Sequence, residues 1–131
     1  MALAPDERSV FVAMSGSREI VRMTLDGRQP PTRSAKLGIL PDNLRWSAEG
    51  ALLTTGMRYD PEANLRCFSG PDCRPPIGVY KIAPGTLALA DLTTRLDLPS
   101  MPLATTALQV GNELWISSLG SQRISVVALR P

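Results

Sequence analysis

Proline and glycine interrupt this chain so often that long helices are excluded before any other feature is considered. Twelve prolines and ten glycines occur among 131 residues, and they divide the chain into apolar stretches of about five to eight residues. Stretches of this length are typical of β-strands, and no segment shows a sustained helical period. The sequence therefore predicts an all-β fold, with strands at residues 10–14, 20–25, 43–47, 51–55, 78–82, 87–92, 106–110, 113–118 and 124–129.

Turn signals separate these strands. Asp26-Gly27 follows the second stretch and favours a tight turn with positive φ at the glycine. The alternation in Leu44-Arg45-Trp46 indicates a strand with one buried face. Short strands joined by tight turns predict antiparallel meanders.

An internal repeat narrows the architecture. Residues 9–20 align without a gap on residues 113–124, and both copies carry a Gly-Ser turn. A weaker third copy starts at Ala51, 51 − 9 = 42 positions after Ser9. Four short strands in a repeat of this length are typical of a β-propeller blade. We therefore expect a single partial β-propeller domain of four-stranded antiparallel blades at about 1–38, 39–98 with a loop insertion at 57–76, and 99–131.

Three blades are too few to close a ring, because closed propellers have roughly four to eight. The third predicted blade also has only three strands. The chain is thus expected to be half of a six-bladed propeller, either as a fragment of a longer protein or as a chain whose homodimer completes the ring.

Charge and composition exclude several function classes. Lys and Arg number 14 against 12 Asp and Glu, and the basic residues are scattered, so we expect neither nucleic acid nor a membrane surface as a partner. Histidine is absent, which excludes a Ser-His triad and a histidine metal site built from this chain alone. No apolar run is long enough to span a bilayer. Residues 1–9 lack the apolar core of a signal peptide, and the sequence leaves a cytoplasmic and a periplasmic location open.

Three segments resemble a known family of enzymes. Residues 3–12, with Pro5-Asp6 leading into an apolar strand, and residues 41–53, with Pro41-Asp42-Asn43, are similar to strand-turn-strand segments of the calcium-dependent gluconolactonase (regucalcin-like) and paraoxonase-like six-bladed propellers. Residues 111–116 resemble their final blade. The resemblance covers nearly the whole chain except the predicted insertion, and it corresponds to the C-terminal half of those proteins.

The resemblance implies a calcium site. In that family one calcium ion lies in the central funnel and polarises the carbonyl of a lactone or ester, and its ligands are carboxylate and amide oxygens. The ligand positions that fall on this chain are Asp42 and Asn43. Other family ligands fall upstream of Met1, and the family's first-blade acid and a paraoxonase histidine have no counterpart here. Asp and Asn after proline are also ordinary residues of turns and strand entries, and this simpler interpretation stays open.

The sequence also raises roles for other residues. Trp46 and Trp115 lie at alternating strand positions and are expected to pack between blades rather than stack on a substrate. Cys67 and Cys73 are close enough in the chain for a local disulfide, with two free thiols as the alternative.

The function expected from the resemblance is that of the C-terminal half of a calcium-dependent lactonase or esterase, inactive alone, acting on small-molecule lactones or carboxylic esters. Two alternatives remain, namely a non-catalytic β-propeller binding or scaffold module and a strictosidine-synthase-like propeller with a different site.

Overall fold

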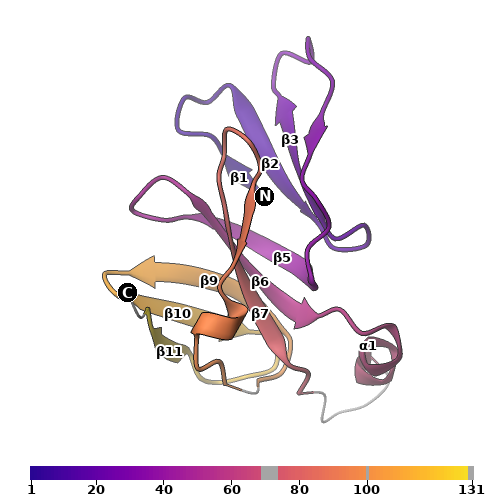
Figure 1. Ribbon diagram of the computed structural model, residues 1–131, viewed down its shortest axis with the longest axis vertical. Coiled ribbons are helices and arrows are strands. Elements are labelled where there is room, and N and C mark those ends of the chain that lie inside the picture. Colours follow the sequence, from indigo (N-terminus) through magenta and orange to yellow (C-terminus); the bar gives the residue numbers. More distant parts are fainter. Residues whose placement is uncertain (69–73, 100, 130–131) are drawn as a thin grey trace.

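The computed structural model describes residues 1–68, 74–99 and 101–129 and consists of three antiparallel sheets (Figure 1). In each sheet the strands follow one another in sequence order, so neighbouring strands pair antiparallel, and only β6 and β7 are joined by a long segment, residues 59–76. The all-β expectation is confirmed. The first sheet contains β1 (Ala2–Leu3), β2 (Ser9–Met14), β3 (Glu19–Thr24) and β4 (Thr32–Arg33). The second contains β5 (Ile39–Trp46), β6 (Leu52–Arg58), β7 (Ile77–Ile82) and β8 (Leu89–Asp91). The third contains β9 (Ala104–Val110), β10 (Glu113–Ser118) and β11 (Ser125–Ala128).

The strand pattern of the sequence agrees closely with this structure. All nine expected strands are present, with ends displaced by a few residues. Gly27 has a φ of +66°, as the Asp26-Gly27 turn requires. Sequence analysis missed β1 and β4, because each is only two residues long and carries no alternation of its own.

One expectation about the insertion was wrong. The segment 57–76 was expected to be a loop, but Met57 and Arg58 complete β6, and α1 (Pro61–Phe68) follows. The Asp60 side chain accepts a hydrogen bond from the Ala63 amide at 3.0 Å, and Pro61 takes the first helical position. Asp-Pro is therefore a helix start here and not a turn signal. A short 3-10 helix, η1 (Thr93–Arg95), follows β8.

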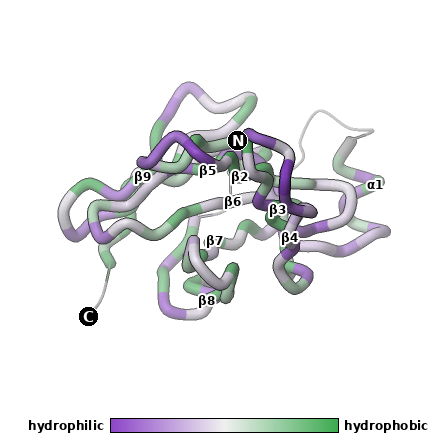
Figure 2. Tube along the Cα trace, turned by 90° about the horizontal axis from the view of Figure 1, so that it is seen from above, coloured by the Kyte–Doolittle hydropathy of each residue, from purple (hydrophilic) through white to green (hydrophobic). Residues whose placement is uncertain are grey.

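The second sheet is the middle layer, and both of its faces are buried. Successive residues of β6 point to opposite faces. Leu52 packs against the first sheet with Phe11 and Ile20, whereas Leu53 packs against the third sheet with Leu114. The first six residues of β6 are all buried. Two hydrophobic cores therefore share this one strand. In Figures 1 and 2, α1 and β9 lie on opposite sides of β6.

A β-bulge interrupts the pairing of β5 with β6. Pro41 pairs with Gly56 and Leu44 pairs with Thr54, so Asp42 and Asn43 together face one residue of β6. A Cβ atom at Gly56 would lie 1.8 Å from the Leu40 carbonyl oxygen. Gly56 thus permits the close approach of the bulged strand.

Polar contacts tie the second sheet to its neighbours. Tyr80 donates its hydroxyl hydrogen to Asp91 at 2.8 Å and accepts the Gly38 amide at 3.1 Å. Glu49, in the β5–β6 turn, accepts hydrogen bonds from Gln109 of β9 at 2.8 Å and from Lys81 of β7 at 3.2 Å. The bond from Gln109, reinforced by Lys81, lowers the pKa of Glu49 from 4.5 to about 2.

Substituting Gly56→Ala should destabilise the protein, because the added methyl group collides with backbone and not with a movable side chain. The expected loss is about 3 kcal/mol, at the upper end for an overpacked site, measured by urea unfolding. Gly16→Ala is the matched control, since a Cβ there meets nothing within 4 Å. Equal stability of the two variants would show that β5 does not approach β6 in this way.

The Glu49 contacts predict a specific acid sensitivity. A carboxylate whose pKa is lowered on folding stabilises the protein above its unfolded value of 4.5, and this contribution disappears as the pH falls through its folded value of about 2. The free energy of unfolding of wild type should therefore exceed that of Glu49→Gln at about pH 6, and the difference should shrink towards pH 2. Chemical denaturation at several pH values measures it. A difference that does not change with pH would contradict the pairing.

Candidate functional site

The residues predicted to bind calcium lie at the bulge of β5. Asp42 is exposed and lines a cleft of about 210 Å³ together with Ser15 of the β2–β3 turn, Met57 of β6 and Thr105 of β9. Asn43 is half-buried and is not one of the residues that line this cleft. β-bulges commonly redirect side chains next to functional sites. The structure thus places Asp42, but not Asn43, in a cleft where three sheets meet.

The electrostatics of Asp42 suit a cation. Although the residue as a whole is exposed, partial desolvation raises the pKa of its carboxyl above the ordinary value of 3.8, and the positive charge of the chain's N-terminus opposes this effect. When protein atoms partly screen a carboxylate from water, a bound cation stabilises its charged form.

The described residues offer only part of a calcium ligand set. Calcium takes about six to eight oxygen ligands. Asp42 offers a carboxylate at the cleft, the Asn43 amide lies next to it in the bulge but does not line the cleft, and the Ser15 hydroxyl already donates to the Pro41 carbonyl. In the described part of the chain, no group of three or more Asp, Glu, His or Cys residues could hold a metal ion. The oxygens at this bulge could therefore provide some, but not all, of the ligands that calcium needs.

Two further acids, Asp6 and Asp26, make local hydrogen bonds within turns. Asp6 and Asp26 each accept a hydrogen bond at 3.0 Å from the backbone amide two positions ahead. Such local bonds are the usual role of aspartate in a turn. Cys67 lies in α1, but Cys73 falls outside the described residues, so the bridge between them stays a prediction.

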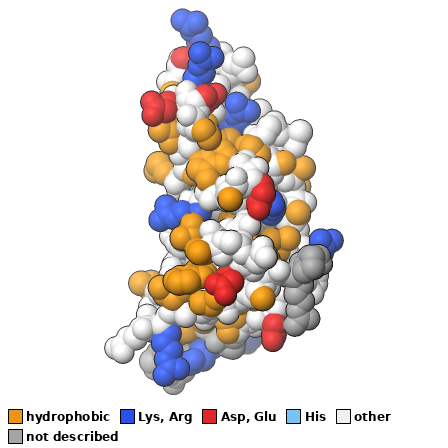
Figure 3. All heavy atoms as spheres, turned by 90° about the vertical axis from the view of Figure 1, so that its left-hand side faces the viewer, with side chains coloured by type: hydrophobic (Ala, Val, Ile, Leu, Met, Phe, Trp, Pro, Cys, Tyr) orange, Lys and Arg blue, Asp and Glu red, His pale blue; other side chains and the backbone are white. Residues whose placement is uncertain are grey.

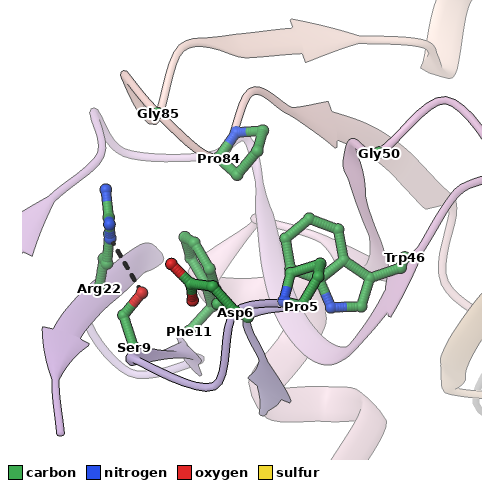
Figure 4. A pocket seen from close by; sticks show the side chains of 10 residues that line it. Pro5, Asp6, Ser9, Phe11, Arg22, Trp46, Gly50, Pro84 and Gly85 are labelled. Carbon is green, nitrogen blue, oxygen red and sulfur yellow. Dashed lines mark hydrogen bonds between the residues drawn. The ribbon is translucent and has the colours of Figure 1, made fainter.

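A second cavity, which sequence analysis did not identify, opens between the first two sheets. It measures about 310 Å³ and is lined by Phe11 and Trp46, with Pro5, Pro84 and Arg22 near its opening (Figure 4). The two aromatic rings meet edge to face, with centroids 5.6 Å apart and an interplanar angle of 88°. No sequence signal joins these residues, because they come from β1–β3, β5 and the turn after β7.

Hydrogen bonds fix the walls of this aromatic cavity. The Trp46 indole donates to the Leu3 carbonyl at 2.8 Å, and the Arg22 guanidinium donates to the Ser9 hydroxyl at 3.3 Å. The guanidinium also lies 5.9 Å from the centre of the Phe11 ring. The cavity combines apolar walls with one charge of each sign, Arg22 and Asp6, a composition that suits a small, mostly apolar ligand.

The two tryptophans have different environments. Trp46 packs between sheets, as the sequence predicts, whereas the Trp115 side chain lies on the outer face of the third sheet and 40% of the residue is exposed. Figure 3 shows hydrophobic side chains gathered along one side of the molecule, with Lys and Arg side chains at its upper and lower ends.

No protein-family model matches the chain, and no curated protein sequence matches it. Across the described residues, no helix is long and apolar enough to cross a membrane.

Proposed function

We propose that this chain is one half of a six-bladed β-propeller lactonase or esterase that depends on calcium, and that it is inactive alone. The observation that carries the proposal is the β5 bulge, which puts the partly desolvated Asp42 carboxylate in a cleft shared by all three sheets. The resemblance of residues 41–53 to the gluconolactonase-like propellers supports it. The three sheets, each a meander in sequence order, would be successive blades.

In this proposal Asp42 and Asn43 hold part of the calcium coordination shell, and the remaining oxygens come from outside this chain. The bound ion would polarise the carbonyl of a small lactone or carboxylic ester. The chain's own contribution is to position these ligands. Gly56 lets β5 approach β6 closely enough for the bulge, and Ser15 secures the Pro41 carbonyl next to Asp42.

The aromatic cavity favours a second candidate, a non-catalytic binding module. Its apolar walls, with Arg22 and Asp6 as the two charged groups, would hold a small, mostly apolar ligand without any metal. The two candidates differ in their response to calcium, since only the first requires the Asp42 carboxylate.

Calcium titration by isothermal calorimetry tests the first proposal. Replacing the Asp42 carboxylate in Asp42→Asn removes a charged ligand, so the affinity for calcium should fall by at least about tenfold, or 1.4 kcal/mol. Asp26→Asn is the matched control, because Asp26 serves a turn in which asparagine can accept the same backbone hydrogen bond. Its affinity should equal that of wild type.

Two results would contradict the calcium proposal. One is calcium binding that is equally strong in wild type and Asp42→Asn. The other is hydrolysis of simple lactones or aryl esters that persists in the presence of a chelator, which would require a different site.

A further inference from the structure

Each of the two outer sheets has one face on which apolar side chains are exposed in the part of the chain that the structure describes. On the first sheet this face, which we call the first outer face, contains the exposed Leu3, Met14 and Met23, the half-buried Val10 and the buried Val21. On the third sheet the corresponding third outer face contains Leu108, Val110, Trp115 and Val126. The large side chains are substantially exposed, for example Leu3 at 48% and Val126 at 51%. Contiguous exposed apolar surface of this kind marks an interaction site.

The two contacts between sheets are made by equivalent residues of the sequence repeat. Phe11 in β2 faces the second sheet, and Leu53, its equivalent in the sequence repeat, faces the third sheet. The residue one position earlier in each repeat points to the opposite face. Leu52 packs on the first sheet, and Leu114 packs on the second sheet. We call the face that packs on the next sheet along the chain the forward face, and the face that packs on the preceding sheet the backward face. In both observed contacts a forward face packs on a backward face.

The two outer faces are one of each kind. Trp115 is the repeat equivalent of Phe11 and Leu53, so it belongs to a forward face, and 40% of the residue is exposed. Val10 is the equivalent of Leu52 and Leu114, so it belongs to a backward face. The register agrees, since Trp115 pairs with Leu108 and Val126, and Val10 pairs with Leu3 and Met23. The chain therefore exposes one forward face and one backward face, the two kinds of face that already pack on each other twice within the chain.

We propose that a second copy of this chain docks head to tail, with the third outer face of each copy packed on the first outer face of the other. Two such contacts close a symmetric pair. The number two rests on the proposed propeller, because three sheets per chain give six sheets in two copies, within the roughly four to eight that close a ring. The head-to-tail contact itself rests on the repeated packing and not on the lactonase proposal. Closure would place two Asp42 clefts in one ring.

Light scattering after gel filtration tests the proposal, on the 131-residue chain with a chelator present. The expected mass is twice the 14.1 kDa of one chain. Because the chelator removes calcium, this result does not depend on the calcium site. A monomer would overturn the proposal, and a ladder of larger polymers would overturn the closed pair.

Two charge substitutions test which faces meet. Trp115→Lys puts a charge on the third outer face beside Glu113, and Met23→Glu puts one on the first outer face. Burying either charge should weaken the dimer at least about 100-fold, so each variant should be monomeric. Leu65→Glu, on α1 and away from both faces, is the matched control and should remain dimeric (Figure 1). Circular dichroism confirms that each variant is folded.

Mixing the two monomeric variants distinguishes head-to-tail docking from its alternatives. A mixed pair joins the unaltered third outer face of the Met23→Glu chain to the unaltered first outer face of the Trp115→Lys chain, so a dimer should reappear. If only one of the two substitutions dissociates the wild-type dimer, a single face packs on its own copy and the proposal is wrong. Folded variants that both dissociate but form no mixed dimer would also contradict it.

Discussion

The structure depends on one strand, β6, that must fill two hydrophobic cores at once. Because strand side chains alternate, Leu52 completes the core with the first sheet while Leu53 completes the core with the third. A shift of the register by one residue would exchange these two side chains and every neighbour with them. Pairing on both sides, with β5 and β7, prevents this shift. The positions of the outer sheets, and of the clefts between them, follow from this one strand.

The same constraint explains where the candidate site lies. β5 must stay paired with β6, yet it contains one residue more than its partner between Pro41 and Leu44. The extra residue leaves the ladder as a bulge, and the bulge turns Asp42 into the cleft between the sheets. Gly56, which has no side chain, leaves room for the Leu40 carbonyl group. Fold and candidate site are therefore coupled through the β5–β6 pair.

Much of the fold could be predicted from the sequence, because prolines, glycines and alternation are local signals. The repeat that aligns Ser9 with Ala51 and Glu113 marks the second strand of each sheet. The α1 helix was missed because Asp60-Pro61 has two meanings, a turn signal in isolation and a helix start when Ala63 and Asn64 can bond back to Asp60. The site was predictable only in part. Asp42 and Asn43 follow from the resemblance, but the bulge that separates their environments and the cavity beside Trp46 arise from tertiary packing.

Native-state hydrogen exchange of the backbone amides tests the central role of β6 most directly. If β6 lies between two cores, its ladder amides should open only on global unfolding and should exchange more slowly than those of β3 and β11, which lie in the two outer sheets. The free energies of exchange for β6 should then equal the free energy of unfolding from denaturant titration. If β6 amides exchange as readily as those of β3 and β11, the second sheet is not the shared layer of two cores, and the account is wrong.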